Sequence, residues 1–134
     1  MADWISAHPI DEVVARWERN PVFGSQPRAL VEAQRAGRLA HAPADLARLL
    51  RSAGQGALEP IWDRLGSLPM PVLALAGEND STYEAAAERI ASLVPHGSAG
   101  VIPRAGHAAH LEAPDAVCDA ILGFVGDLRT PGGT

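Results

Sequence analysis

An acid and a histidine at two turn-like positions are the residues of this chain best suited to chemistry. Asp80 closes the polar segment Gly77-Glu-Asn-Asp80, and His107 closes Arg104-Ala-Gly-His107. A carboxylate bonded to one imidazole nitrogen fixes the tautomer, so that the other nitrogen is able to take a proton from a nucleophile. We therefore interpret Asp80 as an orienting acid and His107 as a general base, with Gly106 allowing the loop to turn tightly.

Other interpretations of these residues stay open. Asp80 could be an ordinary turn aspartate, with Glu78 as the competing acid, and His107 could be a loop histidine bonded to nearby backbone. His107 and His110 have the His-x-x-His spacing of two zinc ligands, but no cysteine or clear third ligand is placed nearby, so we expect no metal. Glu112, just before a proline, is expected to be a capping or supporting carboxylate.

The elements around these two loops alternate between strand and helix. Residues 71–76 and 99–103 are short apolar runs bounded by turn formers, as expected for buried parallel strands. A helix is expected over 84–94, and a last one opens at Pro114 with apolar residues about 3.6 apart. Adjacent parallel strands would bring Asp80 and His107 to one edge of the sheet. Two strands are too few for such a sheet to stand alone.

The first half of the chain predicts only helices. A helix starts near Pro9 and ends at Asn20-Pro21, a second opens at Pro27, and a third opens at Pro43 and breaks at residues 54–56. Residues 59–65 predict a short fourth helix. We expect a helical region over residues 1–58, a strand-bearing region over 59–130 and a disordered tail over 131–134.

Composition excludes several classes of function. The 134 residues carry a net charge of −5, and the 11 basic residues, all arginine, form no cluster, so a nucleic acid is not expected as a partner. No run approaches the roughly 20 apolar residues of a membrane span. The single cysteine, Cys118, lies on the amphipathic last helix, where we expect a buried and inert thiol. A reduced, cytoplasmic location follows as the expectation.

The two loops resemble those of a known fold. "PVLALAGEND" resembles the penultimate core strand of α/β-hydrolases with its acid turn, and "VIPRAGHAAHLEAP" resembles their last strand with its histidine loop. The order of acid and then histidine matches the later part of the Ser…Asp…His arrangement. The resemblance implies an α/β fold: a C-terminal fragment of an α/β-hydrolase, with a helical cap followed by two parallel strands and flanking helices.

The helical half resembles one subfamily. "RWERNPVF", "VEAQRAGRLAH" and "GQGALEPIWDRL" are similar to the cap of the 2-succinyl-6-hydroxy-cyclohexadiene-carboxylate synthases of menaquinone biosynthesis. The resemblance implies elimination of pyruvate from a small carboxylate-bearing substrate, with no metal or organic cofactor. It also implies that Trp17 and Arg35 contact the substrate, since an arginine binds a carboxylate bidentately and an indole offers a flat apolar wall. The alternatives are a core tryptophan and a solvated helix arginine.

The nucleophile of such a triad is missing. No serine of the chain stands in a Gly-x-Ser-x-Gly elbow. We therefore expect a C-terminal fragment that is inactive alone and that has a separate N-terminal half, or a further copy of itself, as a partner. Two further hypotheses remain: a fragment of a carboxylesterase-like hydrolase, and a non-catalytic interaction or folding-partner module.

Overall fold

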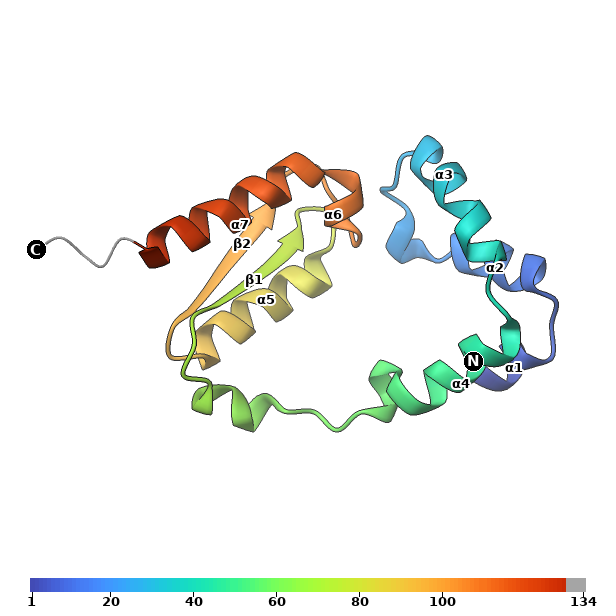
Figure 1. Cartoon of the computed structure of the whole chain (residues 1–134), viewed down its shortest axis with the longest axis horizontal. Helices are drawn as coiled ribbons and strands as arrows, with labels where there is room; N and C mark the ends of the chain where they lie inside the picture. Colours follow the sequence, from blue (N-terminus) through green and yellow to red (C-terminus); the bar gives the residue numbers. More distant parts are fainter. Residues whose placement is uncertain (130–134) are drawn as a thin grey trace, which may run out of the picture. The chain divides into compact units, whose positions relative to one another are not determined.

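The chain divides into two compact units, which are described separately. The computed structural model describes residues 1–129 (Figure 1). The first unit is Met1–Pro60, and the second begins at Ile61. The disordered tail expected over 131–134 lies outside the described residues.

The first unit is entirely helical. The helices expected near Pro9, Pro27 and Pro43 are all present, and each has a proline at or next to its first residue, where a missing N–H is tolerated. The elements are α1 (Ala2–Ser6), α2 (Ile10–Glu18), the 3-10 helix η1 (Pro21–Phe23), α3 (Arg28–Leu39), α4 (Pro43–Ala53) and the 3-10 helix η2 (Gln55–Ala57).

Helix α1 was not predicted, and it closes the small core of the first unit. Ile5 of α1, Val13 of α2 and Ala47 of α4 are buried together. At the surface, Arg51 donates a hydrogen bond to Asp3 at 2.6 Å. This bond from Arg51 holds the pKa of the Asp3 carboxyl below its usual value.

The second unit contains a two-stranded parallel sheet between helices. The strands pair in register from Val72 opposite Gly97 to Gly77 opposite Ile102. Helix α5 packs against both strands, and α7 lies along β2 on the other side (Figure 1). The elements are the 3-10 helix η3 (Trp62–Ser67), β1 (Val72–Gly77), α5 (Ser81–Leu93), β2 (Gly97–Ile102), α6 (Ala109–Glu112) and α7 (Pro114–Arg129).

Several boundaries differ from the sequence expectation. The strands cover Val72–Gly77 and Gly97–Ile102 instead of 71–76 and 99–103. Helix α5 begins at Ser81 instead of residue 84, because the Asp80 side chain accepts a hydrogen bond from the Tyr83 amide and caps the helix. The helix expected over 59–65 is a 3-10 helix over Trp62–Ser67. There the Arg89 guanidinium of α5 lies 4.2 Å from the centre of the Trp62 ring, a cation–π contact that ties η3 to α5.

The expectation that Cys118 is buried was wrong. Its thiol is exposed on α7. Within the described residues, α7 packs against α6 and β2, so much of its apolar surface is left open. Ile121, Leu122 and Leu128 of the same helix are 46%, 68% and 50% exposed. No helix among residues 1–129 is long and apolar enough to cross a membrane.

Candidate functional site

The loops that follow β1 and β2 are joined by backbone hydrogen bonds at one end of the sheet. Because Gly77 and Ile102 are paired, both loops start at the same edge. The Glu78 amide donates to the Ile102 carbonyl at 3.0 Å, and the Asn79 amide donates to the Ala105 carbonyl at 2.8 Å. A Cβ on Gly77 would lie 2.4 Å from that Ala105 oxygen, so only glycine allows the loops to approach this closely.

The predicted acid and base meet at this edge. An Asp80 carboxylate oxygen, Oδ2, lies 2.7 Å from His107 Nδ1. The Asp80 side chain is 8% exposed and that of His107 is 31% exposed. The other Asp80 oxygen accepts the Tyr83 amide at 3.2 Å, and the Tyr83 ring packs edge-on against the imidazole with ring centres 4.7 Å apart. The carboxylate is thus fixed by α5 while it holds the imidazole.

The turn before His107 has an unusual backbone. Arg104 adopts a left-handed conformation with φ of 59°, whereas no described glycine has a positive φ. The tight turn expected at Gly106 therefore has its left-handed residue at Arg104 instead. The Arg104 amide donates to Glu78 Oε2 at 2.7 Å, which supports this conformation. Glu78, the competing acid, is engaged by this amide, and Asp80 is the carboxylate that contacts the imidazole.

A third carboxylate closes the histidine loop from the far side. Glu112 accepts the Gly106 amide through Oε2 at 2.8 Å and the Ala108 amide through Oε1 at 3.2 Å. Those two residues flank His107. Glu112 therefore supports this loop, and since Ala108 is the N-cap residue of α6, it also binds the start of that short helix.

A metal ion has no obvious ligand set here. Residues 1–129 contain no group of three or more histidine, cysteine, aspartate or glutamate side chains arranged to hold one.

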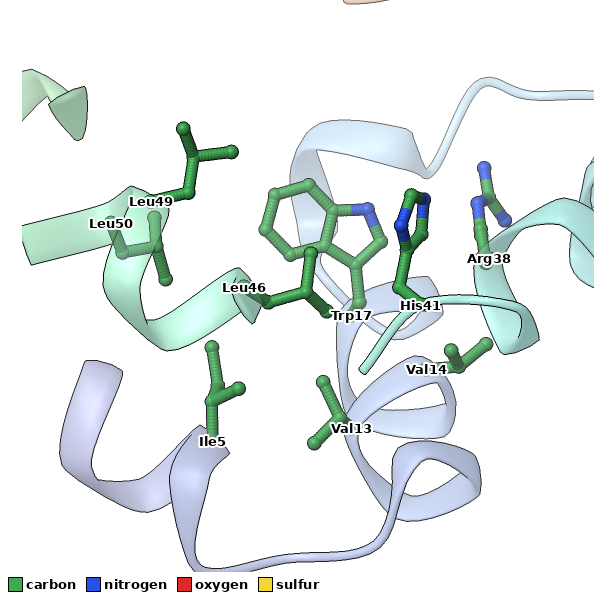
Figure 2. A pocket seen from close by; sticks show the side chains of 9 residues that line it. All are labelled: Ile5, Val13, Val14, Trp17, Arg38, His41, Leu46, Leu49 and Leu50. Atoms are coloured by element: carbon green, nitrogen blue, oxygen red, sulfur yellow. The ribbon is translucent and has the colours of Figure 1, made fainter. Parts of the chain in front are cut away.

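The two residues expected to contact substrate lie in the first unit. Trp17 is at the end of α2, 48% exposed, and its ring packs against Phe23 with ring centres 5.5 Å apart. Trp17 also lines an apolar cavity of about 260 Å³, together with leucine side chains of α4 and with Arg38 and His41 (Figure 2). The indole lines this cavity and, at 48% exposed, is not buried in the core of the first unit.

Arg35 takes a different position from Trp17. It lies on α3, 42% exposed, and donates to a Glu18 carboxylate that is only 12% exposed. Arg38, one turn later, bonds to the other Glu18 oxygen at 3.3 Å. Arg38 lines the cavity with Trp17, and Arg35 is not among its lining residues.

Some residues of these two sites were missed by sequence reasoning. Arg38 and His41 lie in the cap segment "VEAQRAGRLAH" but were not singled out, although Arg35 and Arg38 at i and i+3 on a predicted helix already share a face. The hydrogen bond that the Arg104 amide donates to Glu78 was not predicted, and Glu112 was expected to cap or support without named partners, because these bonds depend on the path of the loop.

Known proteins resemble this chain over nearly its whole length. The family model described as "Alpha/beta hydrolase family" matches residues 1–120. The chain is 32% identical over 117 residues to a putative 2-succinyl-6-hydroxy-2,4-cyclohexadiene-1-carboxylate synthase of Bacillus subtilis, covering 85% of this chain and 43% of that protein. It is 32% identical over 120 residues to the synthase of that name from Salmonella schwarzengrund, covering 90% of this chain and 46% of that protein.

A solved structure is also similar to this chain. The structure of MenH from S. aureus superposes with a TM-score of 0.91 at 32% identity, covering 96% of this chain and 50% of that one. The chain thus spans about half the length of the proteins that it resembles. The resemblance to α/β-hydrolases agrees with the family model, and the resemblance to this synthase subfamily, inferred from the cap segments and the two loops, agrees with the similar proteins and the solved structure.

Proposed function

Because the chain belongs to the α/β-hydrolase family, we propose that it supplies the acid and the base of a Ser-His-Asp triad. The observation that carries the proposal is the 2.7 Å contact between Asp80 Oδ2 and His107 Nδ1. With the Nδ1 proton held by Asp80, Nε2 takes the proton of a serine hydroxyl, and the carboxylate stabilises the imidazolium that forms. No serine of the 134 residues stands in a Gly-x-Ser-x-Gly elbow, so the serine that His107 activates is proposed to come from outside them.

The whole protein is proposed to act as a 2-succinyl-6-hydroxy-2,4-cyclohexadiene-1-carboxylate synthase of menaquinone biosynthesis. The support is the similarity to the Bacillus subtilis and Salmonella schwarzengrund proteins of that name, which are 32% identical to this chain. The activated serine starts proton abstraction beside the succinyl carbonyl of the substrate, and pyruvate leaves. No cofactor enters this scheme, and a cytoplasmic location is part of the same proposal.

Trp17 and Arg35 are proposed to hold the small carboxylate-bearing substrate. The cavity wall formed by Trp17 suits a carbocyclic ring. The bond from Arg35 to Glu18 uses Nη1, and a guanidinium has five N–H donors in a fixed fork. Glu18 therefore orients Arg35 while other donors of the fork bind a substrate carboxylate.

The partner is proposed to be an N-terminal half that bears the serine elbow and the remaining strands. The experiment joins or co-expresses the chain with the elbow-bearing half of one of its relatives. Pyruvate is then measured with lactate dehydrogenase as the substrate is supplied. We expect release of pyruvate from the combined protein and none from either half alone.

Each other outcome selects a different hypothesis. Ester hydrolysis without pyruvate release would identify a carboxylesterase-like hydrolase. Stable association without turnover, while the undivided relative turns over in the same assay, would favour a non-catalytic interaction or folding-partner module. Turnover by the 134-residue chain alone would contradict the proposed triad, since it would need a nucleophile outside an elbow.

A further inference from the structure

The Glu112 carboxylate binds the backbone on both sides of His107. Oε2 accepts the Gly106 amide at 2.8 Å and Oε1 accepts the Ala108 amide at 3.2 Å. Both amides lie in a well-packed stretch, because Ala105 is 0% exposed and Ala108 is 8% exposed. A hydrogen bond to an ionised acceptor is among the stronger ones in proteins. The peptide units before and after His107 are therefore held by one side chain.

The short helix α6 makes this arrangement possible. The Leu111 and Glu112 amides donate to the Ala108 carbonyl at 2.8 and 3.0 Å, which forms one helical turn directly after the loop. This turn brings Glu112 back over the residues that precede it, four and six positions earlier. The carboxylate and the loop that it binds thus belong to one local unit.

We propose that Glu112 is a positioning residue for His107. Asp80 is fixed from one side by the cap of α5, through the Tyr83 amide. His107 has to be fixed independently if the 2.7 Å distance to Asp80 is to be kept. Glu112 does this by fixing the backbone on both sides of His107. The inference rests on the proposed role of His107 as the base and deepens it.

The proposed positioning of His107 depends on the negative charge of the Glu112 carboxylate as well as on its shape. Both bonds are donated by backbone amides, so both carboxylate oxygens must be acceptors. A glutamine has one acceptor oxygen and one donor NH2 group, so in either orientation one amide loses its partner and faces another donor. Glu112→Gln therefore keeps the volume of the side chain and releases one side of the loop.

The test reads the imidazole directly by NMR. The chain is isotope-labelled at its histidines. The chemical shifts of the ring nitrogens give the fraction of His107 in the Nδ1–H tautomer, and the exchange of the Nδ1 proton with water gives the lifetime of that proton. Glu112→Gln is expected to lower the Nδ1–H share and to speed the exchange about ten- to a hundredfold, the factor for loss of one bond to a charged group. The matched control is Asp115→Asn, the same carboxylate-to-amide change at an exposed residue of α7, which is expected to leave both readouts unchanged.

Unchanged tautomer and exchange in a folded Glu112→Gln chain would overturn the proposal. If that variant does not fold, amide exchange of the unaltered chain decides, because Gly106 and Ala108 should both be protected by their bonds to Glu112. Exchange of these two amides at the rate of an unfolded peptide would likewise overturn it. Neither readout needs turnover, so the proposed synthase activity can fail while the positioning role stands, or the reverse.

Discussion

At the scale of single residues, Asp80 is the group on which the candidate site depends. It is the one buried charged residue among residues 1–129. A buried carboxylate is costly unless it is hydrogen-bonded, and here both oxygens have partners, the Tyr83 amide and the His107 ring. The same carboxylate therefore caps a helix and orients an imidazole.

Asp80→Asn tests the acid of the triad. An asparagine keeps the shape, but it has no negative charge to accept the Nδ1–H hydrogen bond and its NH2 group can donate to Nδ1, so the imidazole is expected to take the wrong tautomer. In the protein combined with an elbow-bearing half, kcat for pyruvate release should fall about ten-thousandfold. Glu78→Gln is the matched comparison, since its carboxylate accepts the Arg104 amide and does not contact the ring. A loss of similar size in Glu78→Gln with little change in Asp80→Asn would assign the acid to Glu78 instead.

Arg35→Ala tests the proposed substrate contact. Loss of a hydrogen bond to a charged group costs about 1.5–3 kcal/mol. The KM for the carboxylate-bearing substrate should therefore rise about ten- to a hundredfold, while hydrolysis of a neutral ester stays the same. Arg28→Ala is a suitable control, because Arg28 lies on the same helix, is 92% exposed and pairs with Glu32 one turn later. Equal effects of the two variants would show that Arg35 acts only through its contribution to the net charge of the protein.

The residues of the site were predictable to different degrees. Asp80 and His107 could be found because each follows an apolar strand, and parallel strands end at one edge. The competition between Asp80 and Glu78 could not be decided from sequence, since both carboxylates stand in the same turn and only the path of the Arg104 loop separates them. The roles of Trp17 and Arg35 came from resemblance and stay predictions.

At the scale of elements, the site is the junction of two loops that are packed in direct contact. Their contact is close at Gly77, where a Cβ would lie 2.3 Å from the Gly106 oxygen and 2.4 Å from the Ala105 oxygen. Atoms at these distances must move apart, and the Glu78 and Asn79 amides that bridge the loops would move with them. The spacing of Asp80 and His107 therefore depends on Gly77, whose carbonyl also accepts the Asp80 amide at 2.9 Å.

Gly77→Ala is expected to destabilise the chain by about 1–3 kcal/mol, the usual cost of overpacking a closely packed position. Urea unfolding followed by circular dichroism gives the change. The control is Gly123→Ala on α7, where nothing lies within 4 Å of an added Cβ. A helical alanine there should instead stabilise the chain by about 0.5–1 kcal/mol. A Gly77→Ala chain as stable as the unaltered one would mean that the loops are not packed this closely.

The elements with strong periodicity or proline boundaries were predictable, and the remainder were not. Helices α2, α3 and α4 and both strands follow from such signals. The five-residue helix α1 is too short to show a period, and its Ile5 is buried only because Val13 and Ala47 meet it. The exposure of Cys118 was missed because an amphipathic pattern indicates that one face of a helix is apolar but does not indicate which other element covers that face.

At the scale of the whole molecule, the second unit has more apolar surface than its own elements cover. Its sheet has two strands, so β1 and β2 each have one edge without a partner strand among residues 1–129. Val101 on β2 is 44% exposed and Leu122 on α7 is 68% exposed. Parallel sheets usually have both faces covered and their inner strands paired. The chain spans about half the length of the curated relatives that it matches.

The 134-residue chain by itself is therefore expected to self-associate, because open strand edges and exposed apolar faces favour pairing with another copy. Light scattering should give a mass above that of one 14.0 kDa chain, and addition of an elbow-bearing N-terminal half should convert it to a complex of one copy of each. Leu122→Glu should weaken the self-association by charging the apolar surface of α7. Leu58→Glu, the same change at a 58% exposed residue of the first unit, should leave it unchanged. A monomer with cooperative unfolding in the absence of a partner would show that the second unit is stable with its edges unpaired, and would remove this reason for expecting a separate half.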